Sequence, residues 1–404
     1  MLPIHIVSIL FLVMMYYFIY RMDKKPTYDP RKIFLILLAG AFLLRCILAG
    51  SSEGFASDTA CFAGWANLAF EGGIKNFYAS GVFADYPPGF VYVLYFIGAL
   101  FSLFKIPYLS APCLLLLKLP AIFCDMATAL LFHKIASKKL PPQQIVMLTG
   151  LYLLNPAIIL NSSIWGQVDS VFTLTVLLMC WFLTENKMTP AYIVFGLGVL
   201  LKPQTLVFAP VLIYGIIDRV ILFDFSWRNF FHNLFAGLTV ICFMVLACMP
   251  FGLDLVFLQY ASTLGSYPYV AVNAFNLWGF FGLNWISQET RLLFFSYRTW
   301  GTIILLLIVL LSAMLFFRAQ NKESRYFTTA SFLIISVFLF SVRMHERYLY
   351  PALALILFAY AVRPLKEFLE GYFGFTIIHL YNTAYILYFY DPSNYDRKAP
   401  LILT

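Results

Sequence analysis

Long apolar runs recur along the whole chain, separated by short segments that contain most of the charged residues. Several runs reach the roughly 17–25 residues with which an α-helix crosses a bilayer. The pattern therefore predicts an all-α, polytopic membrane protein with about ten transmembrane helices. The expected spans are residues 4–20, 33–50, 114–132, 145–160, 171–183, 231–249, 302–317, 327–340, 352–362 and 372–390.

Basic residues gather in short clusters between the apolar runs, and these clusters predict how the chain is oriented. Cytoplasmic loops of membrane proteins carry an excess of Lys and Arg. We therefore expect the clusters around Lys24, Lys138 and Lys322 in the cytoplasm. If the apolar run at residues 90–104 crossed the membrane, the Lys138 cluster would lie on the wrong side. We therefore expect residues 90–104 to lie in the interface or to dip in and return, within a long first outer loop at about 51–112 that carries interface helices.

Two short apolar runs, residues 191–201 and 205–217, flank the segment Lys202-Pro203-Gln204. The segments before and after the pair are both expected in the cytoplasm. The pair therefore reads as a broken hairpin whose turn points at the outer half of the membrane. Short, interrupted apolar helices often mark polar sites inside membrane proteins.

The composition supports a membrane protein and excludes a nucleic-acid-binding one. Of the 404 residues, 62% are hydrophobic and 11% are charged, whereas about 25% are charged in a typical soluble domain. The net charge of +8 would suit nucleic acid, but its distribution over short clusters between spans argues against that partner. The seven cysteines show no spacing typical of metal ligands.

The expected topology collects the unusual polar residues on the outer side of the membrane. Ionisable residues close to a membrane-buried surface are costly and tend to mark function. Cations around a cavity suit an anionic leaving group such as a phosphate, and a carboxylate can take the proton of an attacking hydroxyl. The residues concerned are Asp58, Asp85, Asp169, Lys202, His345, Glu346 and Arg347.

The carboxylates also have structural interpretations. Asp58 could cap the helix expected at residues 59–70, because Asp is favoured at that position. The segment Asp85-Tyr86-Pro87-Pro88 could be a turn that starts a helix with Pro at its first position. Asp125, inside an expected span, is interpreted as the partner of a neighbouring polar group.

The cations and the histidine have structural interpretations as well. Lys202 could extend from a helix end toward the membrane interface, and for Arg45 this interpretation is preferred. His345 could be an interface histidine with satisfied hydrogen bonds. The charged residues around it, Arg343, Glu346 and Arg347, favour a functional role instead.

Six short motifs follow one another on the expected outer side: Ser57-Asp58, Asp85-Tyr86-Pro87-Pro88-Gly89, Asn155-Pro156, Trp165-Gly166-Gln167-Val168-Asp169-Ser170, Lys202-Pro203-Gln204 and Met344-His345-Glu346-Arg347-Tyr348. Their order and topology together resemble the GT-C glycosyltransferases. The likeness is in particular to bacterial membrane proteins related to the second GPI mannosyltransferase (PIG-V type), and it covers about residues 30–360. GT-C enzymes also place two interface helices in their first outer loop.

The resemblance implies a sugar donor carried on polyprenyl or dolichyl phosphate and a reaction that usually inverts the anomeric centre. It implies that Asp58 is the catalytic base and that Asp169 binds donor, acceptor or a metal. It also implies that His345 and Arg347 hold the donor phosphate, with help from Lys202. Further substrate contacts are expected from Asp85, Tyr86, Trp165, Gln167, Gln204 and Glu346.

No obligatory cofactor is expected, because cations alone can neutralise a monophosphate carrier. A divalent metal at Asp58 and Asp169 is the alternative. The expected partners are a polyprenyl-phosphate sugar, with mannose as the first choice, a glycan or lipid acceptor, and membrane lipids.

The resemblance divides the chain into an extra N-terminal span with a basic loop at residues 1–30, a catalytic module at 31–362, and an aromatic span with a polar tail at 363–404. It predicts a multi-pass protein of the bacterial plasma membrane whose site faces outward, with the endoplasmic reticulum as the alternative. The rival function is a transporter or flippase of a lipid-linked sugar, which would explain the broken hairpin equally well. A transporter site should lie near the midplane and open to both sides, whereas the residues here gather on one side.

Overall fold

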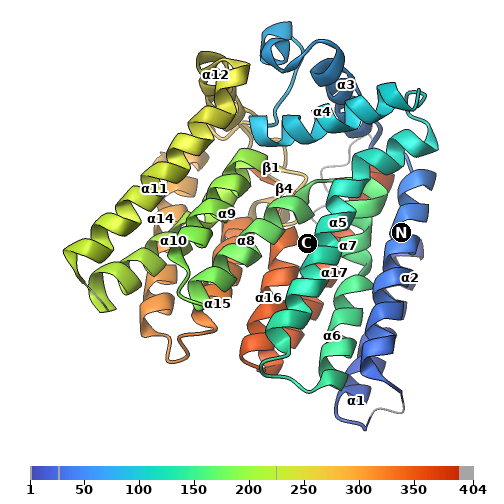
Figure 1. Cartoon of the computed structure of the whole chain (residues 1–404), viewed down its shortest axis with the longest axis vertical. Coiled ribbons are helices and arrows are strands. Elements are labelled where there is room, and N and C mark those ends of the chain that lie inside the picture. The colour runs from blue at the N-terminus through green and yellow to red at the C-terminus, as the bar shows by residue number, and fades with distance from the viewer. Residues whose placement is uncertain (1, 26–27, 224, 391–404) are drawn as a thin grey trace.

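The computed structural model describes residues 2–25, 28–223 and 225–390, which form a bundle of helices (Figure 1). The α-helices are α1 (Leu2–Met22), α2 (Pro30–Ser51), α3 (Ala56–Glu71), α4 (Pro88–Leu103), α5 (Ala111–Ala136), α6 (Pro142–Leu153), α7 (Pro156–Ile159), α8 (Asp169–Thr184), α9 (Met188–Leu201), α10 (Ala209–Ile216), α11 (Trp227–Cys248), α12 (Leu253–Gly265), α13 (Leu277–Phe280), α14 (Tyr297–Arg318), α15 (Arg325–Phe340), α16 (Tyr350–Val362) and α17 (Lys366–Phe389). The 3₁₀-helices are η1 (Ile74–Asn76), η2 (Tyr78–Ser80), η4 (Pro203–Phe208) and η6 (Met249–Phe251), and the π-helices are η3 (Leu160–Trp165) and η5 (Ile217–Phe223). The strands are β1 (Ala271–Val272), β2 (Arg291–Leu292), β3 (Phe295–Ser296) and β4 (Met344–His345).

Six apolar helical segments are long enough to cross a membrane. They are α1, α2, α5, Pro203–Phe223, Trp227–Phe251 and α14. Pro142–Leu153 and Pro156–Trp165 are bent by 42° at their junction, and the number rises to seven if this pair is one broken span rather than a re-entrant loop. The chain is therefore a multi-pass membrane protein of the all-α class. The count of about ten spans stays a prediction, because α8, α9, α15 and α16 are apolar but shorter than the roughly 17 residues that a span needs.

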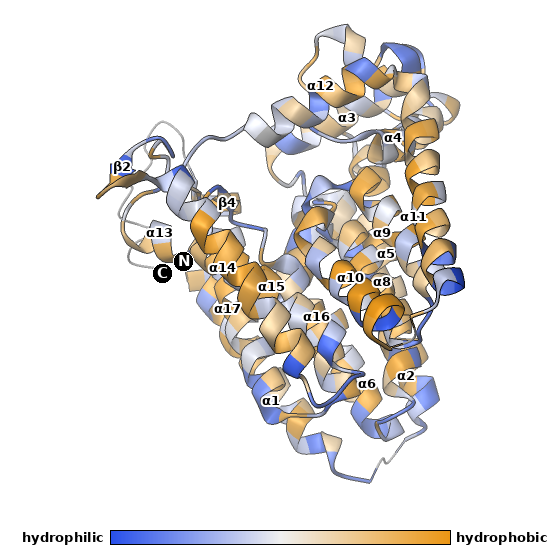
Figure 2. Ribbon diagram, turned by 90° about the vertical axis from the view of Figure 1, so that its left-hand side faces the viewer, coloured by the Kyte–Doolittle hydropathy of each residue, from blue (hydrophilic) through white to orange (hydrophobic). Residues whose placement is uncertain are grey.

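The hydrophilic residues of the bundle are concentrated toward its two ends, whereas the helices between them are mainly hydrophobic (Figure 2). At one end, Lys138 pairs with Glu185 at 2.6 Å and Lys139 pairs with Glu323 at 3.0 Å. These ion pairs join the loops that follow α5, α8 and α14. Two of the basic clusters that are expected to share one side of the membrane therefore lie at the same end of the bundle.

The opposite end is covered by α3 and α4, and α4 lies across the bundle rather than along it (Figure 1). α4 begins at Pro88, whose fixed φ suits the first turn of a helix. α3 and α4 approach closely at Gly98, where an added Cβ would lie 2.1 Å from the Ala66 carbonyl oxygen. Residues 90–104 therefore stay with α3 at this end, which we call the α3–α4 end.

The centre of the bundle is α16, all of whose residues from Tyr350 to Val362 are buried. This helix begins directly after the segment that contains His345, Glu346 and Arg347. The buried helix α16 therefore fixes the position of the C-terminal end of that segment. The last described helix, α17, packs beside α16 and ends at Phe389. The expected polar tail, residues 391–404, lies outside the described residues.

Candidate functional site

Asp58 lies in the first turn of α3, and two side chains from a distant segment hold its carboxylate. Its Oδ2 atom accepts hydrogen bonds from Trp165 Nε1 at 2.9 Å and from Gln167 Nε2 at 2.6 Å. The N-cap residue of α3 is Phe55, so the interpretation of Asp58 as the helix cap is wrong. Both donors bind Oδ2, and Oδ1 accepts no hydrogen bond from the described residues.

The turn at residues 165–167 owes its shape to the helices on either side. The Asn155 side chain caps α7, and the chain continues from α7 into the π-helix η3. Gly166 ends η3 with a φ of 89°, a left-handed conformation that favours glycine. α8 then begins at Asp169. The turn thus directs two side chains at the α3 carboxylate and places a second carboxylate at the start of the next helix.

Asp169 and Lys202 form a buried ion pair, with side-chain exposures of 1% and 5%. Lys202 is the C-cap residue of α9 and lies at the break between α9 and the η4–α10 segment. Asp169 also accepts a hydrogen bond from Asn161 Nδ2 at 3.1 Å. Lys202 therefore points into the protein, and its interpretation as a side chain that extends to the membrane interface is wrong.

Arg347 lies close to Trp165, one of the two residues that donate hydrogen bonds to Asp58. Its Nη1 atom pairs with Glu346 Oε1 at 2.6 Å, and its guanidinium lies 5.8 Å from the centre of the Trp165 ring. The side chain of Arg347 is 20% exposed, while that of Glu346 is 4% exposed. Burial raises the pKa of Glu346, and the positive charge of Arg347 opposes this shift. Arg347 is thus a cation that is held in place and still reaches open space.

The strand β4 holds His345 by pairing in parallel with β1, so that Val272 lies opposite His345. The imidazole lies between two aromatic rings, with centroid distances of 4.8 Å to Tyr267 and 4.9 Å to Tyr348. The Tyr348 hydroxyl accepts a hydrogen bond from Gln204 Nε2 at 3.0 Å. The segment between α12 and α14, which contains Tyr267 and β1, and the α9–η4 break therefore both support the His345 segment.

Asp85 and Tyr86 lie at the edge of the site, in the turn before α4. Tyr86 is buried, and its ring centroid lies 5.2 Å from that of Phe62 on α3. Burial raises the pKa of Asp85 above its usual value, and the positive charge of Arg347 opposes that shift. The turn also starts α4 at Pro88, so the structural interpretation of this motif is confirmed.

The α3–α4 end therefore brings the predicted site residues together. Trp165 joins two of the groups, because it donates to Asp58 and lies against Arg347. Gln204 joins the α9–η4 break to the segment that follows α15. The residues concerned are Asp58, Asp85, Tyr86, Trp165, Gln167, Asp169, Lys202, Gln204, His345, Glu346 and Arg347.

A comparison with protein families identifies the class of enzyme. The model of glycosyltransferase family 87 matches residues 83–342, which is more than half of the chain. The chain belongs to glycosyltransferase family 87. The matched range contains Asp85, Asp169 and Lys202, whereas Asp58 and residues 345–347 lie on either side of it. No curated protein matches the chain.

The described residues of this family 87 glycosyltransferase contain no group of three or more His, Cys, Asp or Glu side chains that could hold a metal ion. Asp58, one of the two alternative metal ligands, accepts its hydrogen bonds from neutral donors. Asp169, the other, is paired with Lys202. The expectation that the enzyme needs no metal stays a prediction.

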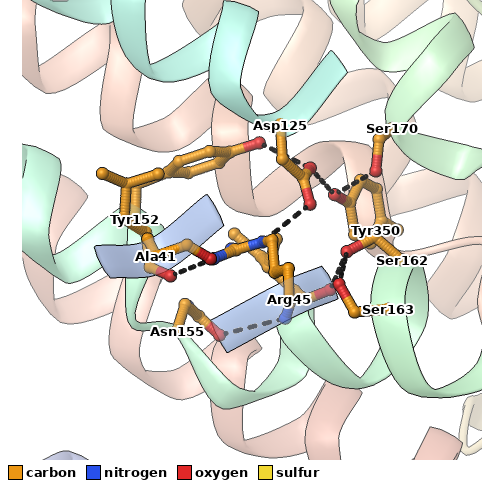
Figure 3. A network of polar contacts seen from close by, with 11 residues as sticks. Ala41, Arg45, Asp125, Tyr152, Asn155, Ser162, Ser163, Ser170 and Tyr350 are labelled. Atoms are coloured by element: carbon orange, nitrogen blue, oxygen red, sulfur yellow. Dashed lines mark hydrogen bonds and ion pairs between the residues drawn. The ribbon is translucent and has the colours of Figure 1, made fainter. Parts of the chain in front are cut away.

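Sequence reasoning misses the extent of a buried network beneath the site (Figure 3). Arg45 is fully buried, with its Nε atom 3.4 Å from Asp125 Oδ2, so it does not extend to the interface. Asp125 Oδ1 accepts a hydrogen bond from the Tyr350 hydroxyl at 2.8 Å. That hydroxyl also lies 2.8 Å from Ser170 Oγ, next to Asp169. Opposite charges in two consecutive expected spans were the signal that could have revealed this pair.

His345 is expected to stay neutral at pH 7. Burial holds the pKa of His345 well below its usual value, and the charges of Arg347 and Lys202 act in the same direction. The neutral ring can donate one N–H to a phosphate oxygen but adds no charge. We expect His345→Gln, which keeps a donor, to lower kcat/KM without changing the shape of its pH profile between about pH 6 and 8. A profile that loses an ionisation near neutral pH in the variant would contradict this expectation.

Proposed function

We propose that this membrane glycosyltransferase moves a sugar, with mannose as the first choice, from a polyprenyl-phosphate carrier to a hydroxyl acceptor. The single observation that carries the proposal is the carboxylate of Asp58, held by two N–H donors beside the cation Arg347. A carboxylate next to a partly exposed cation suits the transfer of a sugar from a phosphate, because one group takes a proton and the other binds the leaving anion.

Asp58 is the proposed base. Both hydrogen bonds from Trp165 and Gln167 end on Oδ2, so we assign Oδ1 as the oxygen that takes the proton of the acceptor hydroxyl. A general base must come within hydrogen-bond reach of the proton that it removes. A carboxylate that is held in one rotamer meets this requirement without further ordering when the acceptor binds.

Arg347 is the proposed phosphate ligand. One of its donors is used by Glu346, while its buried Nε atom has no hydrogen-bond partner among the described residues. A buried N–H without a partner is costly, and an anion bound beside it would remove that cost. His345 adds a neutral donor. Lys202 is paired with Asp169 in the structure. A role for Lys202 at the phosphate therefore requires that its ammonium group bind Asp169 and the donor phosphate at the same time.

An apolar groove supports a lipid-linked donor. It has a volume of about 450 Å³ and lies between α9, the α10–η5 segment and α11. Val199 and Leu206 line this groove, and the Lys202–Gln204 break lies between them in the chain. A chain of isoprene units in the groove would therefore leave its phosphate near the polar groups of the site. A sugar nucleotide has no long hydrocarbon chain to occupy such a groove.

In the proposed reaction, the acceptor hydroxyl attacks the anomeric carbon from the side opposite the phosphate. The bond from that carbon to the phosphate oxygen breaks, and its electron pair leaves with the polyprenyl phosphate. The hydroxyl proton passes to Asp58, and the anomeric configuration inverts. Arg347 and the His345 N–H stabilise the charge on the departing phosphate.

The proposed orientation places the α3–α4 end outside the cytoplasm. The Lys138 and Lys139 loops at the other end support it, because basic loops stay in the cytoplasm. In a bacterium, the donor would then enter from the outer leaflet of the plasma membrane. Likeness of the motifs to relatives of the second GPI mannosyltransferase favours mannose over other sugars.

The test is sugar transfer by the purified protein. It would receive a radiolabelled polyprenyl-phosphate mannose and a crude lipid extract as acceptor, and a labelled product is expected. Parallel reactions with other polyprenyl-phosphate sugars would identify the preferred sugar. No product with any donor, together with movement of the donor across proteoliposome membranes, would favour a transporter or flippase of a lipid-linked sugar instead.

Replacing Arg347 with methionine should weaken catalysis by about 10²–10³-fold, the loss typical of removing one donor to a developing anion. Arg347→Lys keeps the charge and should lose less, although it cannot bind two oxygens in the same plane. Because Arg347→Met also leaves the buried Glu346 unpaired, Glu346→Gln combined with Arg347→Met controls for misfolding. Steady-state rates at several donor concentrations separate the effect on kcat from the effect on KM. Wild-type kcat and KM in a folded Arg347→Met protein would refute the assignment.

A further inference from the structure

Lys118 is a buried cation that neither the motifs nor the proposed reaction uses. It lies in the first half of α5 and is 2% exposed. Its Nζ atom donates to the carbonyl oxygens of Ala49 at 3.3 Å, Ser52 at 2.5 Å and Ile164 at 2.9 Å. An ammonium group has three donors, and here each one has a separate backbone acceptor.

The three acceptors share one feature, because all of them are carbonyls at the C-terminal end of a helix. Ala49 is in the last turn of α2 and Ser52 is its C-cap residue, while Ile164 is in the last turn of η3. Such carbonyls have no partner within their own helix and carry partial negative charge. No described carboxylate lies within ion-pair distance of Lys118. The buried ammonium group of Lys118 thus joins the C-terminal end of α2 to the C-terminal end of η3.

The two helix ends lead directly into the proposed base and its donors. The chain runs from Ser52 through Gly54 into α3, which carries Asp58, and from Ile164 into the turn that carries Trp165. The segments also touch, since a Cβ at Gly54 would lie 2.4 Å from the Trp165 carbonyl oxygen. In addition, Ser52 Oγ donates to the Ile164 carbonyl oxygen at 3.3 Å.

The stem of Lys118 also packs on the turn itself. An added Cβ at Gly166 would lie 2.9 Å from both Cε and Cγ of Lys118. Gly166 therefore combines a left-handed backbone with close contact to the lysine. The head of the side chain joins the helix ends, and its stem supports the turn between Trp165 and Gln167.

We propose that Lys118 is a positioning residue that sets the placement of Asp58 relative to its two donors, Trp165 and Gln167. This inference rests on the proposed function, in which Asp58 is the base. Without the ammonium group, the Ala49 and Ser52 carbonyls lose their side-chain donor. The 3.3 Å bond from Ser52 Oγ to the Ile164 carbonyl then remains as the only hydrogen bond among the described residues between the two helix ends, so the two segments can separate more easily. A displacement of about 1 Å at a catalytic group can cost about 10²-fold in rate. Lys118 thus affects the reaction without touching a substrate.

The first test is a double-mutant cycle on transfer rate. Lys118→Met should lower kcat by about 10- to 100-fold with a smaller change in KM. In an Asp58→Asn background the same substitution should have little further effect, because the group that it positions is already lost. Lys118→Arg, which keeps a multiple donor, should recover part of the rate. Equal fold-losses in both backgrounds would overturn the proposal, because they would indicate a general structural defect.

The matched control is Lys134→Met, the same substitution at an exposed position in the opposite half of α5, and it should leave the rate unchanged. Amide hydrogen exchange gives a readout that does not depend on activity. Peptides that cover residues 52–59 and 160–168 should exchange faster in Lys118→Met but not in Lys134→Met. Unchanged exchange in both peptides would overturn the proposal.

The two proposals can fail separately. Full activity of Asp58→Asn would refute the proposed base. In that case, faster exchange confined to residues 52–59 and 160–168 in Lys118→Met would still support the joining of the two helix ends by Lys118. Absence of that local change would overturn it.

Discussion

Replacing Asp58 with asparagine is expected to reduce the rate of sugar transfer by about 10²–10⁴-fold, the range that general base catalysis contributes. Asparagine has nearly the same shape and keeps an oxygen that can accept the hydrogen bonds from Trp165 and Gln167. The helix α3 does not use Asp58 as its N-cap, so its stability should change little. The variant therefore removes the proton acceptor and leaves the architecture intact.

The measurement is single-turnover transfer with a labelled donor, compared between wild-type and variant protein at equal amounts of folded enzyme. The matched control is Asp254→Asn, which changes an exposed carboxylate at the start of α12, at the same end of the bundle. That control should keep the wild-type rate. Unchanged turnover of Asp58→Asn would exclude Asp58 as the base, and equal losses in both variants would indicate a general effect of charge.

The gathering of the site residues could be predicted because it follows from topology. Hydropathy and the distribution of Lys and Arg place Asp58, the 165–169 motif and residues 345–347 on one side, and the structure brings them to one end of the bundle. The contact between Asp58 and Trp165, by contrast, joins residues more than a hundred positions apart. The packing of residues 52–54, which lead into α3, against the end of η3 creates it. No periodicity in the sequence predicts that packing.

The buried charges show where sequence reasoning fails. Arg45 was expected to extend to the interface because a long cation near a span end often does so. The structure gives it Asp125 as a partner in α5, and a paired charge can stay inside. The role of Lys118 could not be predicted from the sequence, since its partners are backbone carbonyls, which every sequence provides. When a side chain binds main-chain atoms, the sequence contains no residue of opposite charge that would indicate its partner.

The number of spans illustrates a different limit. Hydropathy marks apolar runs, and α8 and α16 are apolar as expected, but both are buried among other helices and shorter than the roughly 17 residues that a span needs. A helix inside a large bundle needs apolar residues for packing whether or not it reaches both surfaces of the membrane. Apolar character alone therefore does not decide how many of the ten expected spans cross the membrane completely.

Lys202→Met is expected to destabilise the protein by about 3–5 kcal/mol, the cost of breaking a buried ion pair from one side. The variant leaves Asp169, whose side chain is 1% exposed, with Asn161 as its remaining hydrogen-bond donor among the described side chains. Removing both charges, as in Lys202→Met with Asp169→Asn, should recover most of that stability, because no buried charge is left unpaired. The midpoint of thermal unfolding in detergent measures both effects, with Lys138→Met as the control for an exposed ion pair.

The rate of transfer by the doubly substituted protein decides what the pair does. If Lys202 and Asp169 only hold the α9–η4 break against α8, restored stability should bring restored activity. If the pair contacts a substrate, as in the proposed sharing of the Lys202 ammonium group with the donor phosphate, the folded double variant should still be slower by about 10²-fold, the loss typical of one missing electrostatic contact to a developing anion. We expect the second result, because the break also positions Gln204, whose amide reaches Tyr348 beside His345. A double variant with both wild-type stability and wild-type rate would restrict Lys202 to a structural role and leave Arg347 as the cation at the phosphate.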